Sequence, residues 1–286
     1  MPITRLDSRS IVSVSGPDAE HFLQNIVTAD LDVLGSGEAK PSALLTPQGK
    51  ILFDFLVSRG GESTFLLECR ADVSDDFVRR LMLYRLRAKV DISKREQSPV
   101  AVSWGYESGA SQTDSTWLRD LRFSSPAQVF RSYEDCAADA DTDAWNAFRI
   151  ENGVAESGAD YALGEAFPHD VLLDELGGVG FRKGCYVGQE VVSRMQHRGT
   201  ARRRVLIVSA DQPLPAPGTD ITAGGRAFGV LGSVAGAKGL AVLRIDRVKD
   251  ALDAGAEITA GGVPVILAIP TFAKFTYPQH VGSESA

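Results

Sequence analysis

Hydrophobic periodicity divides the chain into a long mixed N-terminal part and a shorter β-rich C-terminal part. Residues 10–15 alternate polar and apolar side chains, which is typical of a half-buried strand. A Gly-Pro-Asp turn follows, and apolar residues then recur at helical spacing over residues 19–27. Further strands are predicted over residues 43–45, 51–57 and 64–69, and a second helix over residues 73–86, with Phe77 and Leu81 facing inward.

After Arg204 the pattern changes to short apolar runs that are separated by glycine and proline turns. The sequence Ile-Thr-Ala-Gly-Gly occurs twice, at residues 221–225 and 258–262. A repeated strand-and-turn unit of this kind is typical of a small antiparallel barrel or sandwich. We therefore predict two domains, an α+β region over residues 1–200 and a C-terminal β-barrel over residues 201–280.

The composition is that of a globular protein, with 44% hydrophobic and 23% charged residues among 286. The 30 Lys and Arg against 37 Asp and Glu give a net charge of −7, which argues against direct nucleic-acid binding. The three cysteines, Cys69, Cys136 and Cys185, form no CxxC pair. This argues against a zinc ribbon, a self-contained iron–sulfur ligand set or a disulfide framework, and favours a reducing compartment.

Targeting and membrane signals are not found in the sequence. No stretch approaches eighteen apolar residues, and the N-terminus lacks the apolar run of a secretory signal. We expect no membrane contact, and a cytoplasmic location is the default expectation.

The segment 182–204 is strongly basic, with seven Lys or Arg and a single acid, Glu190. Cys185 lies inside it, close to two cations and just before a predicted helix that begins near Gly188. Nearby cations and the free N–H groups of a helix N-terminus both favour a thiolate. The sequence therefore predicts a reactive, accessible thiol, and the alternative is a small residue packed beneath the loop.

Two other charged groups are candidates for ligand binding. The Glu151 carboxylate could accept hydrogen bonds from two adjacent N–H donors of a pterin-like heterocycle. The alternative is a glutamate at a helix C-terminus that is solvated or paired with Arg149. Arg194 and Arg198, with the arginines at 202–204, could form a funnel for anions, and the alternatives are an i,i+4 pair of Arg194 with Glu190 and a solvated surface.

Other kinds of site find no support in the motifs. His21, His169, His197 and His280 are scattered without HExxH or paired spacing, so no metal site is predicted. GxSxG, GxGxxG and Walker patterns are missing, which argues against a hydrolase elbow and against a nucleotide site.

The sequence Lys-Gly-Cys-Tyr-Val-Gly-Gln-Glu at residues 183–190 resembles the signature of the YgfZ folate-binding proteins. These are relatives of the glycine-cleavage T-protein, an aminomethyltransferase, and their mitochondrial counterparts are iron–sulfur cluster assembly factors. The resemblance extends in order over roughly residues 3 to 250 and includes segments 16–31, 43–51, 149–153 and 174–179.

The resemblance implies an α+β, three-lobed aminomethyltransferase-like fold, in which residues 1–200 form two interleaved lobes before the β-barrel. It implies tetrahydrofolate or a derivative as cofactor, and a role in iron–sulfur cluster assembly or repair in client proteins, including tRNA-modifying enzymes. The location would be the bacterial cytoplasm, or the mitochondrial matrix in a eukaryote. By position, Cys185 matches the functional thiol and Glu151 the pterin-binding carboxylate, and further folate contacts would come from Lys183, Tyr186, Gln189, Glu190, Arg194 and Arg198.

The chain also departs from the aminomethyltransferases. Those enzymes lack the cysteine motif, and no residue here matches their catalytic aspartate, which argues against classical transferase activity. A folate-dependent aminomethyl or one-carbon transferase is the alternative function. An RNA- or protein-binding module that uses residues 194–204 is a third hypothesis, and the acidic remainder of the chain disfavours it.

Overall fold

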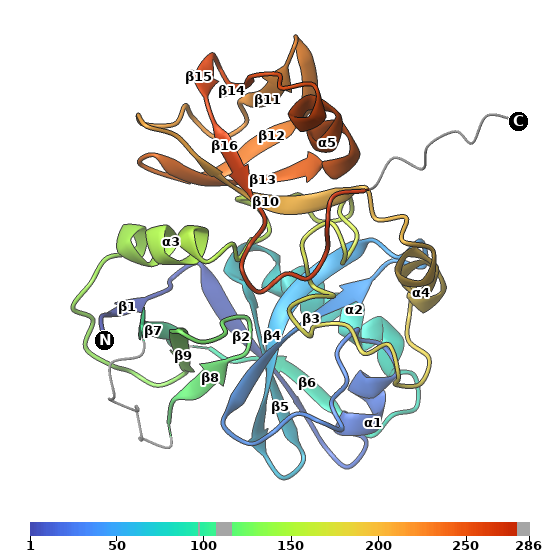
Figure 1. The fold of residues 1–286 in the computed structure, drawn as a ribbon. Helices are drawn as coiled ribbons and strands as arrows, with labels where there is room; N and C mark the ends of the chain where they lie inside the picture. Colours follow the sequence, from blue (N-terminus) through green and yellow to red (C-terminus); the bar gives the residue numbers. More distant parts are fainter. Residues whose placement is uncertain (97, 107–115, 279–286) are drawn as a thin grey trace, which may run out of the picture.

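A computed structural model describes residues 1–96, 98–106 and 116–278 (Figure 1). Within them the N-terminal half forms one nine-stranded sheet. The order across this sheet is β1 (Ile3–Arg5), β7 (Ala101–Tyr106), β9 (Ala127–Ser132), β8 (Leu118–Asp120), β3 (Glu38–Leu45), β4 (Ile51–Gly61), β5 (Thr64–Arg70), β2 (Arg9–Ser15) and β6 (Asp91–Lys94). All pairs are antiparallel except β3 with β8.

Two helices cover one face of strands β2, β4, β5 and β6. They are α1 (Ala19–Gln24) and α2 (Ser74–Arg85), the second preceded by a short 3-10 turn, η1 (Ala71–Val73). Phe77 and Leu81 of α2 are fully buried, which confirms the prediction that they face inward. Helix α3 (Thr142–Glu151) packs Trp145 and Phe148 against a second core around β7 and β9. Apolar side chains are therefore buried on both faces of this one curved sheet, and each of the two cores forms the centre of one lobe.

The C-terminal region contains a seven-stranded sheet. Helix α4 (Gln189–Arg198) precedes the first strand of this sheet in the sequence, and helix α5 (Ile245–Asp253) lies between its fourth and fifth strands in the sequence. The strand order is β15 (Val263–Pro264), β14 (Ile258–Ala260), β11 (Asp220–Ala223), β12 (Arg226–Ala235), β13 (Lys238–Arg244), β10 (Arg203–Ser209) and β16 (Ile266–Ala268). The two Ile-Thr-Ala-Gly-Gly copies form β11 and β14, which pair with each other so that Thr222 lies opposite Thr259.

Residues 270–275 return from this sheet to the N-terminal lobes (Figure 1). Phe272 packs against the core that contains Trp145, and Phe275 lies against the cluster of Ile150, Leu172 and Val205. Gly153 has a φ of +73°, and a Cβ there would lie 2.6 Å from the ring of Pro270. The turn just after α3 and residues 270–275 therefore meet between the two sheets.

The predicted elements agree with the structure except at their ends. The first helix stops at Gln24 instead of Val27, because Val27 pairs with Leu44 in an isolated bridge. Strand β3 begins at Glu38, five residues before the predicted strand. No helix in the described ranges is both long and apolar enough to cross a membrane.

Candidate functional site

The cysteine loop, residues 178–188, connects the irregular segment after α3 to the start of α4 (Figure 1). Its first turn is fastened to the N-terminal lobe by Thr28. The Thr28 Oγ1 hydroxyl donates to the Gly178 carbonyl at 2.7 Å, and the Gly180 N–H donates to the Thr28 carbonyl at 2.8 Å. Both bonds join segments about 150 positions apart, so the loop depends on tertiary structure for its shape.

Lys183 provides the next attachment of the loop. Its Nζ donates to the carbonyls of Val27 at 2.9 Å and Ala29 at 2.6 Å, and it lies over the ring of Tyr186 at 5.3 Å. Burial lowers the pKa of Lys183 to about 8, against the opposing effect of Asp30. The ammonium therefore binds the backbone after α1, and the folate contact that the resemblance implies for Lys183 stays a prediction.

Gly188 closes the loop at the N-cap of α4 in a left-handed conformation, with φ +79°. A Cβ at this position would lie 2.6 Å from the Thr46 carbonyl and 3.0 Å from Leu45 Cβ. Opposite it, a Cβ on Gly49 would lie 2.9 Å from Val191 Cβ. Only glycine allows this close approach of the loop to the β3–β4 turn.

The three cysteines differ sharply in exposure. Cys185 is exposed, Cys136 is partly exposed, and Cys69 is buried in the sheet, where burial raises the pKa of its thiol to about 12. The alternative that Cys185 is a packed core residue is therefore wrong. The described part of the chain holds no group of three or more metal-ligating side chains that could bind an ion by itself.

Helix α4 carries four of the predicted site residues directly after the loop. It buries Val192, leaves Gln189 half-buried and exposes Glu190, Arg194 and Arg198. Within the described ranges neither arginine takes part in a hydrogen bond or ion pair, so the i,i+4 pair of Arg194 with Glu190 is not formed. Both guanidinium groups are thus exposed to solvent on the helix that follows the cysteine loop.

Glu151 lies apart from the cysteine loop, at the end of α3, which Figure 1 shows on the opposite side from α4. Its Oε1 accepts a hydrogen bond from Lys238 at 2.6 Å, and its Oε2 accepts one from Tyr106 at 3.1 Å. The bond from Lys238 lowers the pKa of Glu151. Glu151 and Lys238 line a surface hollow of about 380 Å³ together with Trp104 and Phe148.

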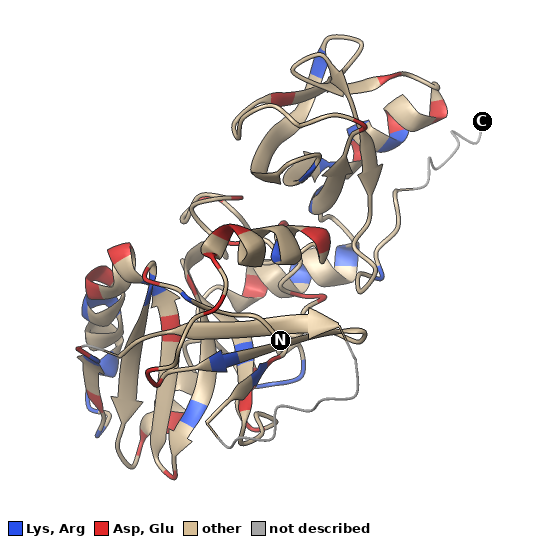
Figure 2. Ribbon diagram, turned by 90° about the vertical axis from the view of Figure 1, so that its left-hand side faces the viewer, with Lys and Arg blue, Asp and Glu red and all other residues tan. Residues whose placement is uncertain are grey.

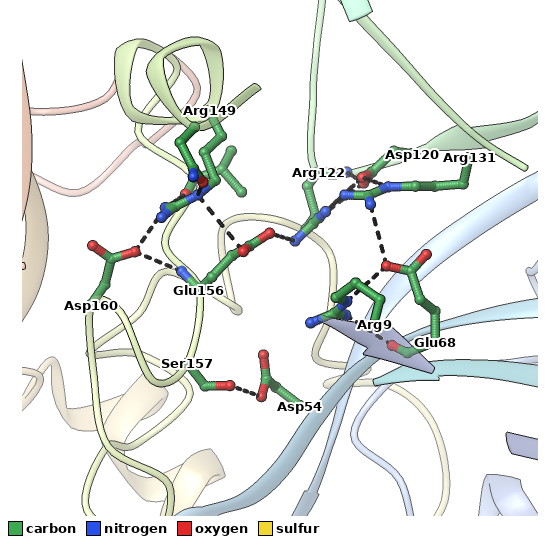
Figure 3. A network of polar contacts seen from close by, with 12 residues as sticks. Arg9, Asp54, Glu68, Asp120, Arg122, Arg131, Arg149, Glu156, Ser157 and Asp160 are labelled. Atoms are coloured by element: carbon green, nitrogen blue, oxygen red, sulfur yellow. Dashed lines mark hydrogen bonds and ion pairs between the residues drawn. The ribbon is translucent and has the colours of Figure 1, made fainter. Parts of the chain in front are cut away.

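A buried network of charges, which the sequence did not indicate, connects the two lobes and the C-terminal sheet (Figure 3). Arg131 donates to Asp120 at 3.1 Å and to Glu68 at 3.2 Å, and Glu68 also accepts from Arg9 at 3.0 Å. Arg122 donates to Asp120 at 2.7 Å. These side chains are almost completely buried, so each charge depends on its partners for solvation.

Arg149 extends the network to the C-terminal sheet. Its Nη1 donates to Asp160 at 2.8 Å, and its Nη2 donates to the Ser233 hydroxyl of β12 at 2.6 Å. The Ser233 N–H in turn donates to Asp160 at 2.8 Å. The sequence alternative of a pair between Arg149 and Glu151 is therefore not formed, because Arg149 turns toward the interior.

A cavity of about 1190 Å³ lies beside this end of the network, between β2, α3 and the β12–β13 turn. Its walls include three arginines and three acids, Arg9, Arg70, Arg149, Asp72, Asp143 and Glu156. Figure 2 shows acidic positions at both ends of α3, the helix above this region. The volume is somewhat above the usual range of about 300–1,000 Å³ for small-molecule sites, and the polar groups suit a ligand with several donors and acceptors.

Glu156 is a half-buried carboxylate of this cavity whose acceptor atoms are free. Its oxygens lie 3.7 Å from Arg149 and 3.8 Å from Arg122, and among the described residues they accept no hydrogen bond (Figure 3). Burial would raise the pKa of Glu156, but Arg149, Arg9 and Arg122 outweigh it and lower the pKa to about 2. The group is therefore an anion at neutral pH that a donor-rich ligand could bind.

Comparison with protein families matches two separate parts of the chain. Residues 6–103 match the GCVT N-terminal domain, and residues 202–275 match the C-terminal β-barrel domain of CAF17. The second match covers the seven-stranded sheet from β10 onward.

Two curated relatives carry the same name. The mitochondrial iron–sulfur cluster assembly factor IBA57 of Mus musculus is 32% identical over 285 residues, which cover 87% of this chain and 79% of the mouse protein. The IBA57 homolog of Chaetomium globosum is also 32% identical, over 71% of this chain. The aligned part is 55% of that fungal protein.

Among solved structures, the glycine cleavage system aminomethyltransferase T of Bartonella henselae has the same fold. The TM-score is 0.71 at 16% identity, and the match covers 97% of this chain and 87% of the other. This confirms the predicted α+β, aminomethyltransferase-like fold with a C-terminal β-barrel.

Proposed function

We propose a function from one premise, that the chain belongs to the CAF17/IBA57-type family of iron–sulfur cluster assembly factors. The protein supports assembly or repair of clusters in client enzymes, and tRNA-modifying enzymes are among these clients. On its 183–190 sequence we assign it to the YgfZ type within this family. We place its work in the mitochondrial matrix if the chain is eukaryotic and in the cytoplasm if it is bacterial.

The observation that carries this proposal is an exposed thiol on a firmly attached loop. Cys185 stands in solvent, while Lys183 and Gly188 on either side are fixed against the N-terminal lobe. One thiolate supplies one iron ligand, and a stable cluster needs several. Such a thiol can hold a cluster only while a partner supplies the other ligands, which suits transfer or repair better than storage.

Replacing Cys185 by alanine is expected to abolish this support. In cells that lack the native gene, the variant should leave client cluster enzymes and tRNA modification at the level of the deletion under oxidative stress. Cys136→Ala is the matched control, because Cys136 is the other cysteine with some exposure, and it should restore both readouts fully. Full rescue by the Cys185 variant would end the thiol role.

We further propose that tetrahydrofolate or a derivative, a carrier of one-carbon units, binds in the central cavity. Glu156 supports this, since it is ionised and has free acceptor oxygens for the N–H groups of a reduced pterin. Arg70 at the cavity wall is half-buried and pairs with Asp72 through Nε and Nη2, which leaves its Nη1 for the glutamate tail of the ligand. In contrast, both oxygens of Glu151 already accept hydrogen bonds.

Calorimetric titration with tetrahydrofolate tests the ligand and its site together. We expect Glu156→Gln to weaken binding about tenfold or more, since a hydrogen bond to a charged acceptor contributes about 1.5–3 kcal/mol. Glu151→Ala tests the prediction that Glu151 holds the pterin, and Arg194→Ala and Arg198→Ala test the predicted contacts on α4. If wild-type protein takes up no tetrahydrofolate, the folate proposal fails while the thiol proposal stands.

A further inference from the structure

The exposed end of α2 carries an apolar surface that the fold does not use. Met82, Leu83 and Leu86 are 44%, 69% and 87% exposed, and their spacing of one, three and four residues places them on one side of the helix. Single exposed apolar residues are ordinary, but three adjacent ones on one helix end are a patch. The side chains contribute little to the core, which is filled from the opposite side by Phe77 and Leu81.

Leu86 is also held in an unfavourable backbone conformation. It is the C-cap of α2, with φ +46° and ψ −106°, whereas glycine usually takes positive φ at this position. For a bulky residue the left-handed region costs about 1–2 kcal/mol. The chain therefore accepts strain to place a leucine where it is almost fully in solvent, and strain of this kind is common at sites of function.

Unpaired arginines surround the three apolar side chains. Within the described ranges, Arg80, Arg85 and Arg87 form no ion pair or hydrogen bond. At the other end of α2, Asp75 pairs with Lys94 and Asp76 with Arg79, and Asp72 in the preceding turn η1 pairs with Arg70. The α2 patch, defined as residues 80, 82, 83, 85, 86 and 87, is thus an apolar centre with a cationic rim.

We propose that the α2 patch is a docking surface for a partner protein whose contact face has an aliphatic centre and a rim of carboxylates. An apolar centre within a polar rim is the usual anatomy of a protein interface, and arginine is enriched there. An anionic membrane fits less well. An extended flat anionic surface would also meet the remainder of the chain, whose net charge is −7.

The α2 patch and the cysteine loop are attached to one segment of the N-terminal lobe. The Lys89 N–H just after the patch donates to Asp18 at 2.7 Å, at the start of α1. The cysteine loop is held through Lys183 to Val27 and Ala29, just beyond the end of α1. A partner bound at the patch would therefore dock on the lobe that also presents Cys185.

Photo-crosslinking from within the patch identifies the partner. Full-length protein with benzoylphenylalanine in place of Leu83 is expressed in its host cells, and a second protein carries it in place of Ile266 as the control. Ile266 is 70% exposed and apolar, but it lies on β16 in the C-terminal sheet. A protein adduct that forms from position 83 and not from 266 is expected, and no adduct above the control would overturn the proposal.

The crosslinked protein is then purified and titrated against defined variants. Leu86→Gly and Arg87→Glu should each weaken binding at least tenfold, and added salt should weaken it further, while Ile266→Ala should not change it. Leu86→Gly should not lower the free energy of unfolding, because glycine relieves the strain at φ +46°. Loss of affinity with retained stability is a result that a merely structural role for Leu86 would not give.

Other occupants of the patch would give distinct results. An adduct only with a second copy of this chain, or binding only to vesicles of phosphatidylcholine and phosphatidylglycerol, would contradict a protein partner of different sequence. Equal affinity of the captured protein for the wild type and for both patch variants would also contradict the proposal that the α2 patch is its docking surface. Cys185→Ala should crosslink normally, so failure of the thiol role and failure of this interface are separable.

Discussion

Replacing Arg131 by methionine is expected to lower the free energy of unfolding by about 3 kcal/mol. Arg131 is buried and joins Asp120 to Glu68, so its removal leaves two buried carboxylates short of compensation. Loss of one partner from a buried ion pair costs about 3–5 kcal/mol. We expect the lower end of that range, because Asp120 keeps Arg122 and Glu68 keeps Arg9. Urea unfolding followed by circular dichroism gives the value.

Arg79→Met is the matched control for this prediction. Arg79 pairs with Asp76 on the surface of α2, where their side chains are 75% and 60% exposed. Exposed pairs of this kind contribute about 0.2–1 kcal/mol, so the control should change stability by less than about 1 kcal/mol. Equal effects of the two substitutions would show that the network does not hold the lobes together.

Gly188→Ala is expected to destabilise the protein by about 2–4 kcal/mol and to displace the cysteine loop. The alanine would occupy φ +79°, which costs about 1–2 kcal/mol, and its Cβ would lie 2.6 Å from the rigid Thr46 carbonyl. Overpacking adds about 1–3 kcal/mol, and relaxation of the loop absorbs part of it. Thermal unfolding measures the loss of stability, and alkylation of Cys185 by iodoacetamide reports the change in the loop.

Gly184 offers a control in the same loop. A Cβ at Gly184 would meet no atom within 4 Å, and its φ is not in the left-handed region. Gly184→Ala should therefore change stability by less than about 0.5 kcal/mol, as is usual for surface substitutions. If both alanine variants behave alike, the close approach at Gly188 does not fix the loop.

The cysteine loop could be found from the sequence because its determinants are contiguous. The motif at 183–190 carries the thiol, its cations and the start of α4 within eight residues. What the sequence could not show is the role of Lys183, because its partners Val27 and Ala29 are backbone carbonyls more than 150 positions away. Every residue type has a backbone carbonyl, so the identity of a residue does not show that its carbonyl accepts a hydrogen bond from Lys183.

The central network was missed for a different reason. Its members come from strands, turns and helix α3 between Arg9 and Asp160. Apart from Asp120 and Arg122, the hydrogen-bonded charge partners are 11 or more positions apart, as in the pair of Arg131 with Asp120. One signal was present, since Glu68 is the only charge in the apolar strand run 64–69. A carboxylate at such a position must find a cation across the sheet.

The choice between Glu151 and Glu156 depends on where α3 ends. The helix stops at Glu151, and the turn at Gly153 sends the following segment inward, so Glu156 faces the cavity while Glu151 stays outside. Spacing alone cannot give this change of direction. The two glutamates are five positions apart and lie next to different hollows.

The return of residues 270–275 to the N-terminal lobes bears on how the protein is made. Phe272 and Phe275 complete clusters begun by Trp145 and Leu172, more than 100 positions earlier. While these phenylalanines are still inside the ribosomal exit tunnel, the inner clusters of the nascent polypeptide stay open. We expect chains arrested at that stage to be cut by protease between the lobes, and protection to appear once residues 270–275 have emerged.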